Sequence, residues 1–326
     1  MRILVVGAGS IGTRHIRNLL QLKAGEVECC DSRPARVEEM RAQFAIQGTT
    51  RLEEALDRRP GAVIIAAPTH LHVPIAMQAI QTGAALLIEK PVSNSLEEAE
   101  RLAAAARQRR AVILIGCNMR FHPGVAALKK SMEAGLLKKP LMHQAWFSHS
   151  LANWRPGTDY RQTYSARRDQ GGGIIFEGTH ELDYLRWIFG EVADLDCFAE
   201  QVGDLEIDSE DLALIRLRFE SGAVGQLHLD YLNPFKMRGC EVTGTDGILR
   251  WSSEGKSPEK VLVEHFDGRK KAWQDLVRLD SYDANQMYLQ ELQHFLDCAG
   301  GSAAPMADLE TGLRVVQLAL AAKEKA

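Results

Sequence analysis

The sequence lacks a marked excess of charge of either sign. Its 39 lysines and arginines nearly balance its 43 aspartates and glutamates, and the formal net charge is −4. The basic clusters that do occur, such as Arg107 with Arg109 and Arg110, are short and lie where a helix is expected to end, a position that favours solvated positive charge. Proteins that bind nucleic acid usually carry an extended basic surface. We therefore expect no nucleic-acid partner.

Cysteine pairs and long apolar runs are also missing. The six cysteines follow no C-x-x-C or other metal-ligand spacing, so we expect reduced, apolar fillers and no metal site; they are Cys29, Cys30, Cys117, Cys197, Cys240 and Cys298. The apolar run at residues 3–6 is too short and has the wrong flanks for a signal peptide or a membrane span. These absences predict a cytoplasmic protein that does not attach to membranes.

The length of 326 residues predicts two domains. In residues 1–120, short apolar runs alternate with helix-length amphipathic segments. The runs expected to be strands are residues 3–6, 27–30, 62–67, 85–88 and 112–116, and helices are expected to begin near Ile11, Pro34, Leu52, Pro74 and Leu96. Apolar strands separated by helices indicate a parallel sheet covered on both faces. We therefore predict an α/β fold whose first domain is a doubly wound Rossmann domain.

The pattern changes after Pro123. Polar and apolar residues now alternate over residues 141–148, 212–220, 223–231 and 240–251, with turns at Ser221-Gly222 and Asp246-Gly247. Helical patterns cover residues 174–189, 288–298 and 308–325. We predict that residues 121–326 form an α+β domain with a large, open, mostly antiparallel sheet that binds substrate and forms an oligomer. An alternative for the last helices is that they pack back on the first domain.

The first apolar run leads into a glycine motif. Gly7, Gly9 and Gly12 form a G-x-G-x-x-G pattern that also contains Ser10 and Ile11 and opens the first helix. In this context Gly7 permits a tight turn, Gly9 lets backbone N–H groups approach a pyrophosphate, and Gly12 allows close helix packing. The pattern predicts a dinucleotide site.

The end of the second expected strand selects the cofactor. Asp31 lies about 20 residues after the third glycine, where a carboxylate accepts hydrogen bonds from ribose hydroxyls. This carboxylate would repel a 2′-phosphate, which favours NAD. Arg33, two residues further on, could turn to bind that phosphate, so NADP stays an alternative.

Two further motifs end the third and fourth expected strands. They are Ala67-Pro68-Thr69-His70-Leu71-His72 and Glu89-Lys90-Pro91, both at the carboxyl edge where ligands of open α/β sheets bind. Together with the N-terminal glycine motif, and with a later glycine run followed by His180, this ordered set resembles the Gfo/Idh/MocA family of glucose-fructose oxidoreductase, inositol dehydrogenase and rhizopine-catabolism proteins. The resemblance covers essentially the whole chain.

The resemblance implies roles for these residues. It places Lys90 beside the nicotinamide and the reacting carbon, where its amine orients the substrate hydroxyl and takes part in proton transfer. His180 is similar to the family's acid/base, which takes the hydroxyl proton as the hydride leaves. Further cofactor contacts are expected from the other strand-end residues, namely Ala67, Thr69, His72 and Glu89.

A single helix over residues 174–189 would place residues 177, 180, 183 and 184 on one face. A carboxylate at Glu177 or Asp183 could then contact substrate or orient the imidazole of His180. Many family members carry an aspartate four residues before this histidine, whereas this chain has Phe176 there. The departure puts the role of Glu177 in doubt.

The remaining candidates for substrate binding lie outside that helix. Arg120 lies in the segment expected to cross between the two domains, where pockets are common. Trp154 offers an apolar face to a sugar ring, and Arg155 or Arg161 could hold a carboxylate or phosphate. An alternative is that this loop packs against a neighbouring subunit.

These observations predict an NAD(P)-dependent oxidoreductase that moves a hydride to or from a hydroxyl or carbonyl carbon of a sugar, sugar nucleotide or cyclitol. The alternatives are a reductase of a non-sugar carbonyl compound, a cofactor-sensing regulator without catalysis, and a purely structural subunit. A large open sheet that nothing else in the sequence covers predicts a homodimer or homotetramer.

Overall fold

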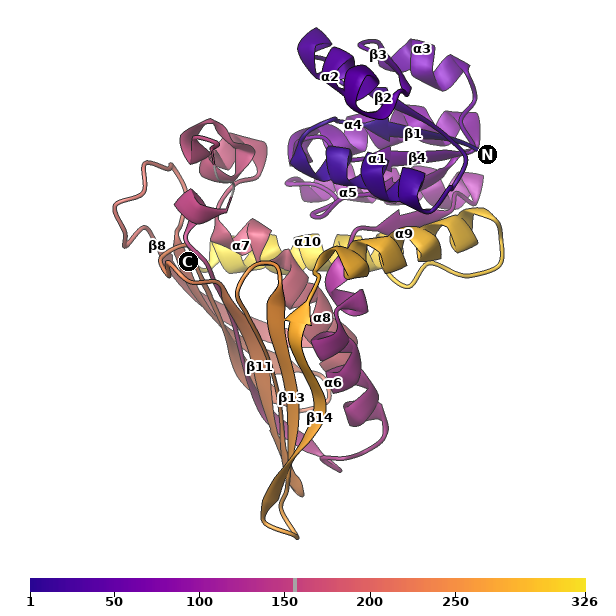
Figure 1. Ribbon diagram of the computed structural model, residues 1–326. Coiled ribbons are helices and arrows are strands. Elements are labelled where there is room, and N and C mark those ends of the chain that lie inside the picture. The colour runs from indigo at the N-terminus through magenta and orange to yellow at the C-terminus, as the bar shows by residue number, and fades with distance from the viewer. Residues whose placement is uncertain (155–156) are drawn as a thin grey trace. The chain divides into compact units, whose positions relative to one another are not determined.

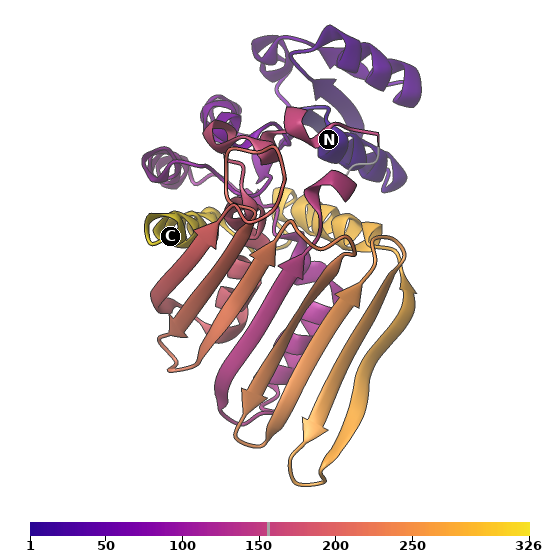
Figure 2. The same cartoon turned by 90° about the vertical axis from the view of Figure 1, so that its left-hand side faces the viewer.

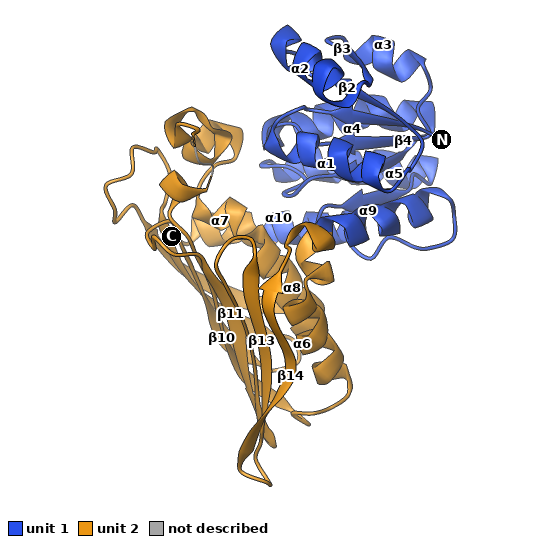
Figure 3. Cartoon of the chain, viewed as in Figure 1, with its two compact units in different colours: residues 1–117, 288–317 blue, residues 118–287, 318–326 orange. Residues whose placement is uncertain are grey.

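The computed structural model describes residues 1–154 and 157–326 (Figure 1). Arg155, a predicted substrate contact, lies outside the described residues. The chain forms two compact units (Figure 3). The first contains Met1–Cys117 and Tyr288–Gln317, and the second contains Asn118–Met287 and Leu318–Ala326. The first unit is therefore assembled from two separate stretches of the chain.

The first unit is built around a six-stranded sheet in the order β3-β2-β1-β4-β5-β6. All neighbouring strands are parallel, which confirms the predicted doubly wound fold. The strands are β1 Arg2–Val6, β2 Glu26–Cys30, β3 Gln47–Thr49, β4 Ala62–Ile65, β5 Ala85–Ile88 and β6 Ile113–Ile115. The prediction from sequence omitted β3, a three-residue edge strand without an apolar run.

The helices that connect these strands are α1 Ser10–Gln21, α2 Pro34–Phe44, α3 Leu52–Asp57, α4 His72–Ala79 and α5 Leu96–Arg109. Most of α9, Asn285–Ala299, joins this unit from the later stretch of the chain. Strands β4 and β5 are buried at every position, as expected of a parallel sheet with helices on both faces. Helix α5 begins where predicted, because the hydroxyl of Ser95 accepts a hydrogen bond from the backbone N–H of Glu98.

The second unit contains an eight-stranded sheet in the order β14-β13-β12-β11-β7-β10-β9-β8 (Figure 2). Its strands are β7 Pro140–Ser148, β8 Val192–Glu200, β9 Leu212–Phe219, β10 Val224–Asp230, β11 Met237–Gly244, β12 Gly247–Glu254, β13 Glu259–Asp267 and β14 Ala272–Tyr282. Strands β7 and β10 run parallel, and the other neighbours are antiparallel. The mostly antiparallel sheet is therefore confirmed.

Helices cover one face of this sheet. Helix α6, Pro123–Glu133, packs on β12, β13 and β14. Helix α7, Ile174–Glu177, packs on β9 and β10, and α8, Thr179–Phe189, packs on β7. Strand β9 alternates buried and exposed residues throughout, so its buried side chains face the helices. The opposite face carries exposed apolar residues, including Phe198, Leu214 and Trp273. Among the described residues, every helix is too short or too polar to span a bilayer.

The predicted helix over residues 174–189 is wrong as a single element. It consists of α7, Ile174–Glu177, and α8, Thr179–Phe189, separated by Gly178. A side chain at Gly178 would collide with Leu229 of β10. The chain approaches the sheet closely there. Glu177 and His180 lie on two different helices, and so do not share the face of a single helix.

The last helix, α10 Leu309–Glu324, contains the boundary between the two units. Its residues up to Gln317 belong to the first unit, together with α9. Within that unit the carbonyl of Ala307 accepts a hydrogen bond of 2.8 Å from the backbone N–H of Ile115, at the end of β6.

Candidate active site

The glycine motif forms the turn between β1 and α1. Gly7 has a φ of +93°, and a Cβ there would lie 2.5 Å from the carbonyl oxygen of Ala66. A Cβ on Gly12 would collide with the carbonyl oxygen of Gly7, whereas a Cβ on Gly9 would meet nothing within 4 Å. Side chains are therefore excluded at Gly7 and Gly12, while the backbone at Gly9 faces open space.

The first turn of α1 fits an anion. Gly9 is its N-cap, and among the described residues no side chain caps it and no acidic residue lies in the first turn. The leading N–H groups of a helix have no partners within the helix, and its dipole favours negative charge there. With the open backbone at Gly9, this turn, which includes Ser10 and Ile11, suits the pyrophosphate of a dinucleotide.

Asp31 follows β2 and is almost fully buried. Its carboxylate accepts hydrogen bonds from the backbone N–H of Ala8 at 2.8 Å and from the backbone N–H of Arg33 at 3.0 Å. The guanidinium of Arg33 also donates to it at 2.9 and 3.0 Å. Burial alone would raise the pKa of Asp31, but these hydrogen bonds outweigh it and hold the pKa below its ordinary value. The carboxylate therefore stays ionised beside the glycine turn.

A second arginine, which the sequence analysis did not identify, also contacts this turn. Arg36 in the first turn of α2 donates from Nε to the carbonyl oxygen of Ala8 at 2.9 Å and from Nη2 to the hydroxyl of Thr13 at 3.1 Å. Arg36 lies three residues after Arg33, and this spacing could have identified it from the sequence. The guanidinium of Arg33 thus binds the Asp31 carboxylate, and that of Arg36 binds the backbone of the glycine turn.

The residues after β4 form the next part of the candidate site. Ala67 and Thr69 follow this strand, and Thr69 and His72 are buried. The imidazole of His72 lies 2.8 Å from the carbonyl oxygen of Ala67 and 2.9 Å from that of Pro91. Burial lowers the pKa of His72, so the ring is neutral and donates to one of these two oxygens at a time. His72 thereby connects the turn after β4 to the E-K-P turn.

Glu89 and Lys90 come directly after β5. The carboxylate of Glu89 lies 2.7 Å from Nε2 of His15, a fully buried residue of α1. On its other side it lies against Gly116, where a Cβ would be only 3.0 Å from Oε2 of Glu89. The sequence analysis did not identify His15, because nothing in the local pattern connects it to the E-K-P motif.

In the second unit, His180 lies in the first turn of α8 and is half-buried. The neighbouring residue Glu181 is completely buried and forms an ion pair of 2.8 Å with Arg238 of β11. The guanidinium of Arg238 lies 4.2 Å above the ring of Phe147. An ion pair therefore anchors the start of α8 to the sheet beside His180.

Arg120 and Asp183, both predicted substrate contacts, are buried and paired with each other. Nε and Nη2 of Arg120 donate to the two carboxylate oxygens of Asp183 at 2.9 and 2.7 Å. Arg120 also lies 5.2 Å from the centre of the Trp187 ring. A two-pronged pair of this kind fixes both side chains, so it holds the middle of α8 to the segment that precedes α6.

The other predicted substrate contacts lie in separate places. Glu177 is buried in α7 and accepts a hydrogen bond of 2.6 Å from the hydroxyl of Ser165. The indole N–H of Trp154 donates to the carbonyl oxygen of His149 at 3.0 Å, and its ring stacks on the His149 ring. Arg161 is exposed and pairs with Asp159 and Glu206. The residues described here thus do not form one cluster.

His149 shows that positive charge gathers at the end of the sheet near Trp154. Burial, followed by the nearby cations Lys256, Lys236 and Arg238, lowers the pKa of His149 to about 4. Lys236 is itself paired with the buried Glu259. The sequence analysis did not identify these cations, because they come from separate strands and turns.

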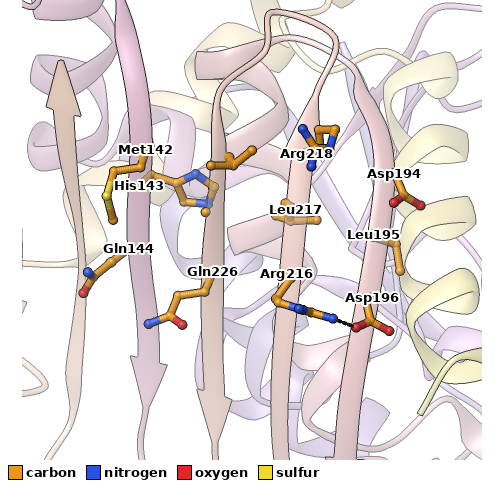
Figure 4. A pocket seen from close by; sticks show the side chains of 12 residues that line it. Met142, His143, Gln144, Asp194, Leu195, Asp196, Arg216, Leu217, Arg218 and Gln226 are labelled. Carbon is orange, nitrogen blue, oxygen red and sulfur yellow. Dashed lines mark hydrogen bonds and ion pairs between the residues drawn. The ribbon is translucent and has the colours of Figure 1, made fainter. Parts of the chain in front are cut away.

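A hollow on the sheet of the second unit is lined by none of the predicted residues. It has a volume of about 540 Å³ and lies across β7, β10, β9 and β8 (Figure 4). Its lining includes Gln144, Gln226 and an ion pair between Arg216 and Asp196. It is a feature of the sheet, and His180 is not among the residues that line it.

Comparisons with known proteins agree with this geometry. Residues 1–117 match the family model described as "Oxidoreductase family, NAD-binding Rossmann fold". Residues 129–326 match the model described as "Oxidoreductase family, C-terminal alpha/beta domain". The glycine turn after β1, the acidic residue after β2 and the two family matches define the class, and the protein is an NAD-dependent oxidoreductase. It belongs to the Gfo/Idh/MocA family, which confirms the resemblance found in the sequence.

Individual relatives span nearly the whole chain. A scyllo-inositol 2-dehydrogenase (NAD(+)) from Bacillus subtilis (strain 168) is 26% identical over 94% of this chain and 88% of the relative. A levoglucosan dehydrogenase, solved with NADH and levoglucosan, has a TM-score of 0.87 at 18% identity, covering 100% of this chain and 97% of that chain. The WlbA dehydrogenase from Bordetella pertussis, solved with NADH and UDP-GlcNAcA, has a TM-score of 0.84 at 21% identity, covering 100% and 96%.

Proposed function

We propose that the protein transfers a hydride between NAD and a hydroxyl or carbonyl carbon of a sugar, sugar nucleotide or cyclitol. In this reaction Lys90 and His180 handle the proton. The relatives named above support the substrate class, since one is named for a cyclitol and two were solved with a sugar or a sugar nucleotide.

The observation that carries the proposal is the position of Glu89-Lys90 at the carboxyl end of β5. The glycine turn lies at the carboxyl end of β1, and β1, β4 and β5 are parallel. Ligands of open α/β sheets bind at this edge. The hydrogen-bond contact between Glu89 and His15 of α1 ties the E-K-P turn to the helix that follows the glycine turn.

The cofactor carries the hydride, and residues of the protein orient the substrate and carry the proton. When bound, NAD supplies the hydride acceptor, held by the glycine turn and Asp31. The amine of Lys90 donates a hydrogen bond to the substrate oxygen and orients it. The imidazole of His180 accepts the hydroxyl proton during oxidation and returns it during reduction. The ion pairs Glu181–Arg238 and Asp183–Arg120 hold the helix that carries His180.

We propose that some of the predicted substrate-binding residues contact the substrate directly and that others act indirectly. Trp154 and Arg161 are proposed to contact the substrate directly, and partial exposure of both side chains supports this. Glu177, Arg120 and Asp183 are buried, which supports an indirect role in shaping the site. We propose residues 121–326 as the part of the chain that binds substrate.

The test is oxidation of a panel of polyols and sugars with NAD. The panel contains myo-inositol, scyllo-inositol, levoglucosan and UDP-GlcNAcA, and formation of reduced nicotinamide is followed by absorbance. For the best compound, we expect the K90A and H180A variants to lower kcat by at least about a hundredfold, within the range typical of lost acid–base catalysis. Their NADH affinity should stay close to that of the wild type.

The matched control is K130A, which removes an exposed lysine of α6. It should leave kcat unchanged. Turnover by K90A and H180A at the wild-type rate would contradict the proposed roles. Turnover only of carbonyl compounds unrelated to sugars would contradict the proposed substrate class.

We also propose that the protein forms a homodimer or homotetramer in the cytoplasm. The exposed apolar residues on the uncovered face of the sheet, Phe198, Leu214 and Trp273, support the association. The cysteines are all buried and free of disulfides, which suits a reducing compartment. Light scattering of the wild type and the F198E and L214E variants tests the association, and a monomeric wild type would contradict it. Cell fractionation tests the compartment.

A further inference from the structure

The E-K-P turn is fixed on both sides of Lys90. On one side, the carboxylate of Glu89 contacts Nε2 of His15 at 2.7 Å. On the other side, the carbonyl oxygen of Pro91 lies 2.9 Å from the imidazole of His72. The backbone N–H of Glu89 also donates to the carbonyl oxygen of Ile65 at 3.0 Å, which joins the turn to β4. Lys90 is therefore the residue between two anchored neighbours.

The anchor at Glu89 is tightly enclosed. His15 is 0% exposed and Glu89 is 9% exposed. The absence of a side chain at Gly116 leaves room for the Glu89 carboxylate, since a Cβ there would approach Oε2 to 3.0 Å. The ring of His15 packs edge-on against Tyr288, whose own ring lies 4.4 Å from the guanidinium carbon of Arg14. The carboxylate thus lies in a nearly enclosed space between His15 and Gly116.

This contact joins elements that are not neighbours in the sheet. His15 lies in the second turn of α1, five residues after Ser10, whereas Glu89 follows β5. Strand β4 separates β1 from β5. The contact therefore spans a strand and connects the helix of the pyrophosphate turn directly to the turn that carries Lys90.

We propose that His15 is a positioning residue: through the Glu89 carboxylate it sets the direction of Lys90 relative to the dinucleotide turn. This inference rests on the proposed role of Lys90. His15 itself contacts neither cofactor nor substrate. Misplacing a reacting group by about 1 Å can lower the rate on the order of a hundredfold. A fixed E-K-P turn would therefore keep the rate high by holding Lys90 in position.

The first test uses the cofactor-free protein and needs no substrate. Lys90 is labelled with acetic anhydride at several pH values, and the labelled peptide is measured by mass spectrometry. In H15L, which removes the ring nitrogens, we expect the labelling rate of Lys90 to change by about threefold or more, because the amine has a new environment. In H15Q, whose amide can still donate to Glu89, we expect a rate close to that of the wild type.

The matched control is H122L in the second unit. His122 is also a buried histidine beside a buried carboxylate, with 3.3 Å between its Nε2 and Oε2 of Glu259. H122L should lower thermal stability without changing the labelling of Lys90. If H15L fails to fold, H15N takes its place, because its shorter amide falls short of the Glu89 carboxylate.

The second test measures turnover of the best panel compound and NADH affinity in H15L, E89Q and the double variant. We expect kcat to fall about 10- to 100-fold in H15L while the Kd for NADH changes by less than about threefold. If His15 acts only through Glu89, the double variant will be no slower than E89Q alone.

Two outcomes separate this inference from the proposed function. If H15L leaves both the labelling of Lys90 and kcat at wild-type values, His15 is only a structural partner of Glu89 and the inference is wrong. If K90A keeps wild-type turnover, the proposed role of Lys90 is wrong. In that case the labelling of Lys90 in H15L still reports whether His15 positions it.

Discussion

His143 gives the second unit a specific sensitivity to acid. This residue of β7 is 1% exposed, and its ring lies 5.0 Å from that of Phe189 and 5.5 Å from that of Phe219. It lies over Gly225 of the neighbouring strand, where any side chain would collide with it. Burial lowers the pKa of His143 from 6.5 to about 4. The folded protein therefore holds the ring neutral at pH values where the unfolded chain would protonate it.

The sign and size of the effect follow from linkage. Between the two pKa values the unfolded state binds more protons than the folded state, so stability is present above the unfolded pKa and is lost as pH falls from 6.5 toward 4. A group with this shift loses about 2 kcal/mol between about pH 7.5 and about pH 5. His149, whose pKa is also lowered to about 4, adds a loss of similar size in the same window.

Tryptophan fluorescence isolates this unit, because all five tryptophans lie in it: Trp146, Trp154, Trp187, Trp251 and Trp273. Urea unfolding is measured at about pH 7.5 and about pH 5. We expect H143L to lose about 2 kcal/mol less than the wild type between these two pH values. The control F189L loosens the same packing without removing a titrating group, so its pH dependence should match the wild type. An equal loss in H143L and wild type would refute the reasoning.

Three further predictions concern the cofactor turn and the buried pair. In G12A the new methyl group collides with the carbonyl of Gly7, so NADH binding, measured by fluorescence titration, should be lost; retained binding would show that the turn can adjust. D31N removes the charge that repels a 2′-phosphate, and we expect NADH to bind about tenfold more weakly while NADPH does not; an unchanged ratio of the two affinities would exclude Asp31 as the selector. D183N removes the carboxylate facing the buried Arg120 and should cost about 3–5 kcal/mol in urea unfolding, whereas a loss below about 1 kcal/mol would mean that the pair contributes little.

The elements that sequence predicted best are those with strong local signals. The buried strands β1, β4 and β5 are continuous apolar runs, and each ends at a recognisable motif. Strand β3 has neither property, since it is only Gln47–Thr49 at the sheet edge. Strand β14 is exposed along most of its length, so it shows no clear alternation. The helical pattern is interrupted at Gly178, where the side chain of Leu229, distant in sequence, leaves no room for a Cβ.

Some residues of the candidate site could be identified from the sequence, and their interaction partners could not. The glycine turn and Asp31 could be identified because each fits a short pattern with a mechanical reason. The E-K-P motif could be identified because it follows an apolar strand and resembles the family's motif. The partners could not, because they are set by the fold: His15 and Glu89 are 74 residues apart, and Arg120 and Asp183 are 63 apart. Nothing in either segment alone indicates such a pairing.

The two-stretch construction of the first unit has a consequence for how such proteins can recombine. Residues 1–117 lack α9 and the first part of α10, which complete that unit from the far end of the chain. A single crossover that replaced everything after Cys117 would also replace those helices and separate them from the sheet they evolved with. Exchange of substrate specificity between relatives, by evolution or in the laboratory, therefore calls for two junctions, one near Cys117 and one near Tyr288, so that the intervening segment moves as a cassette.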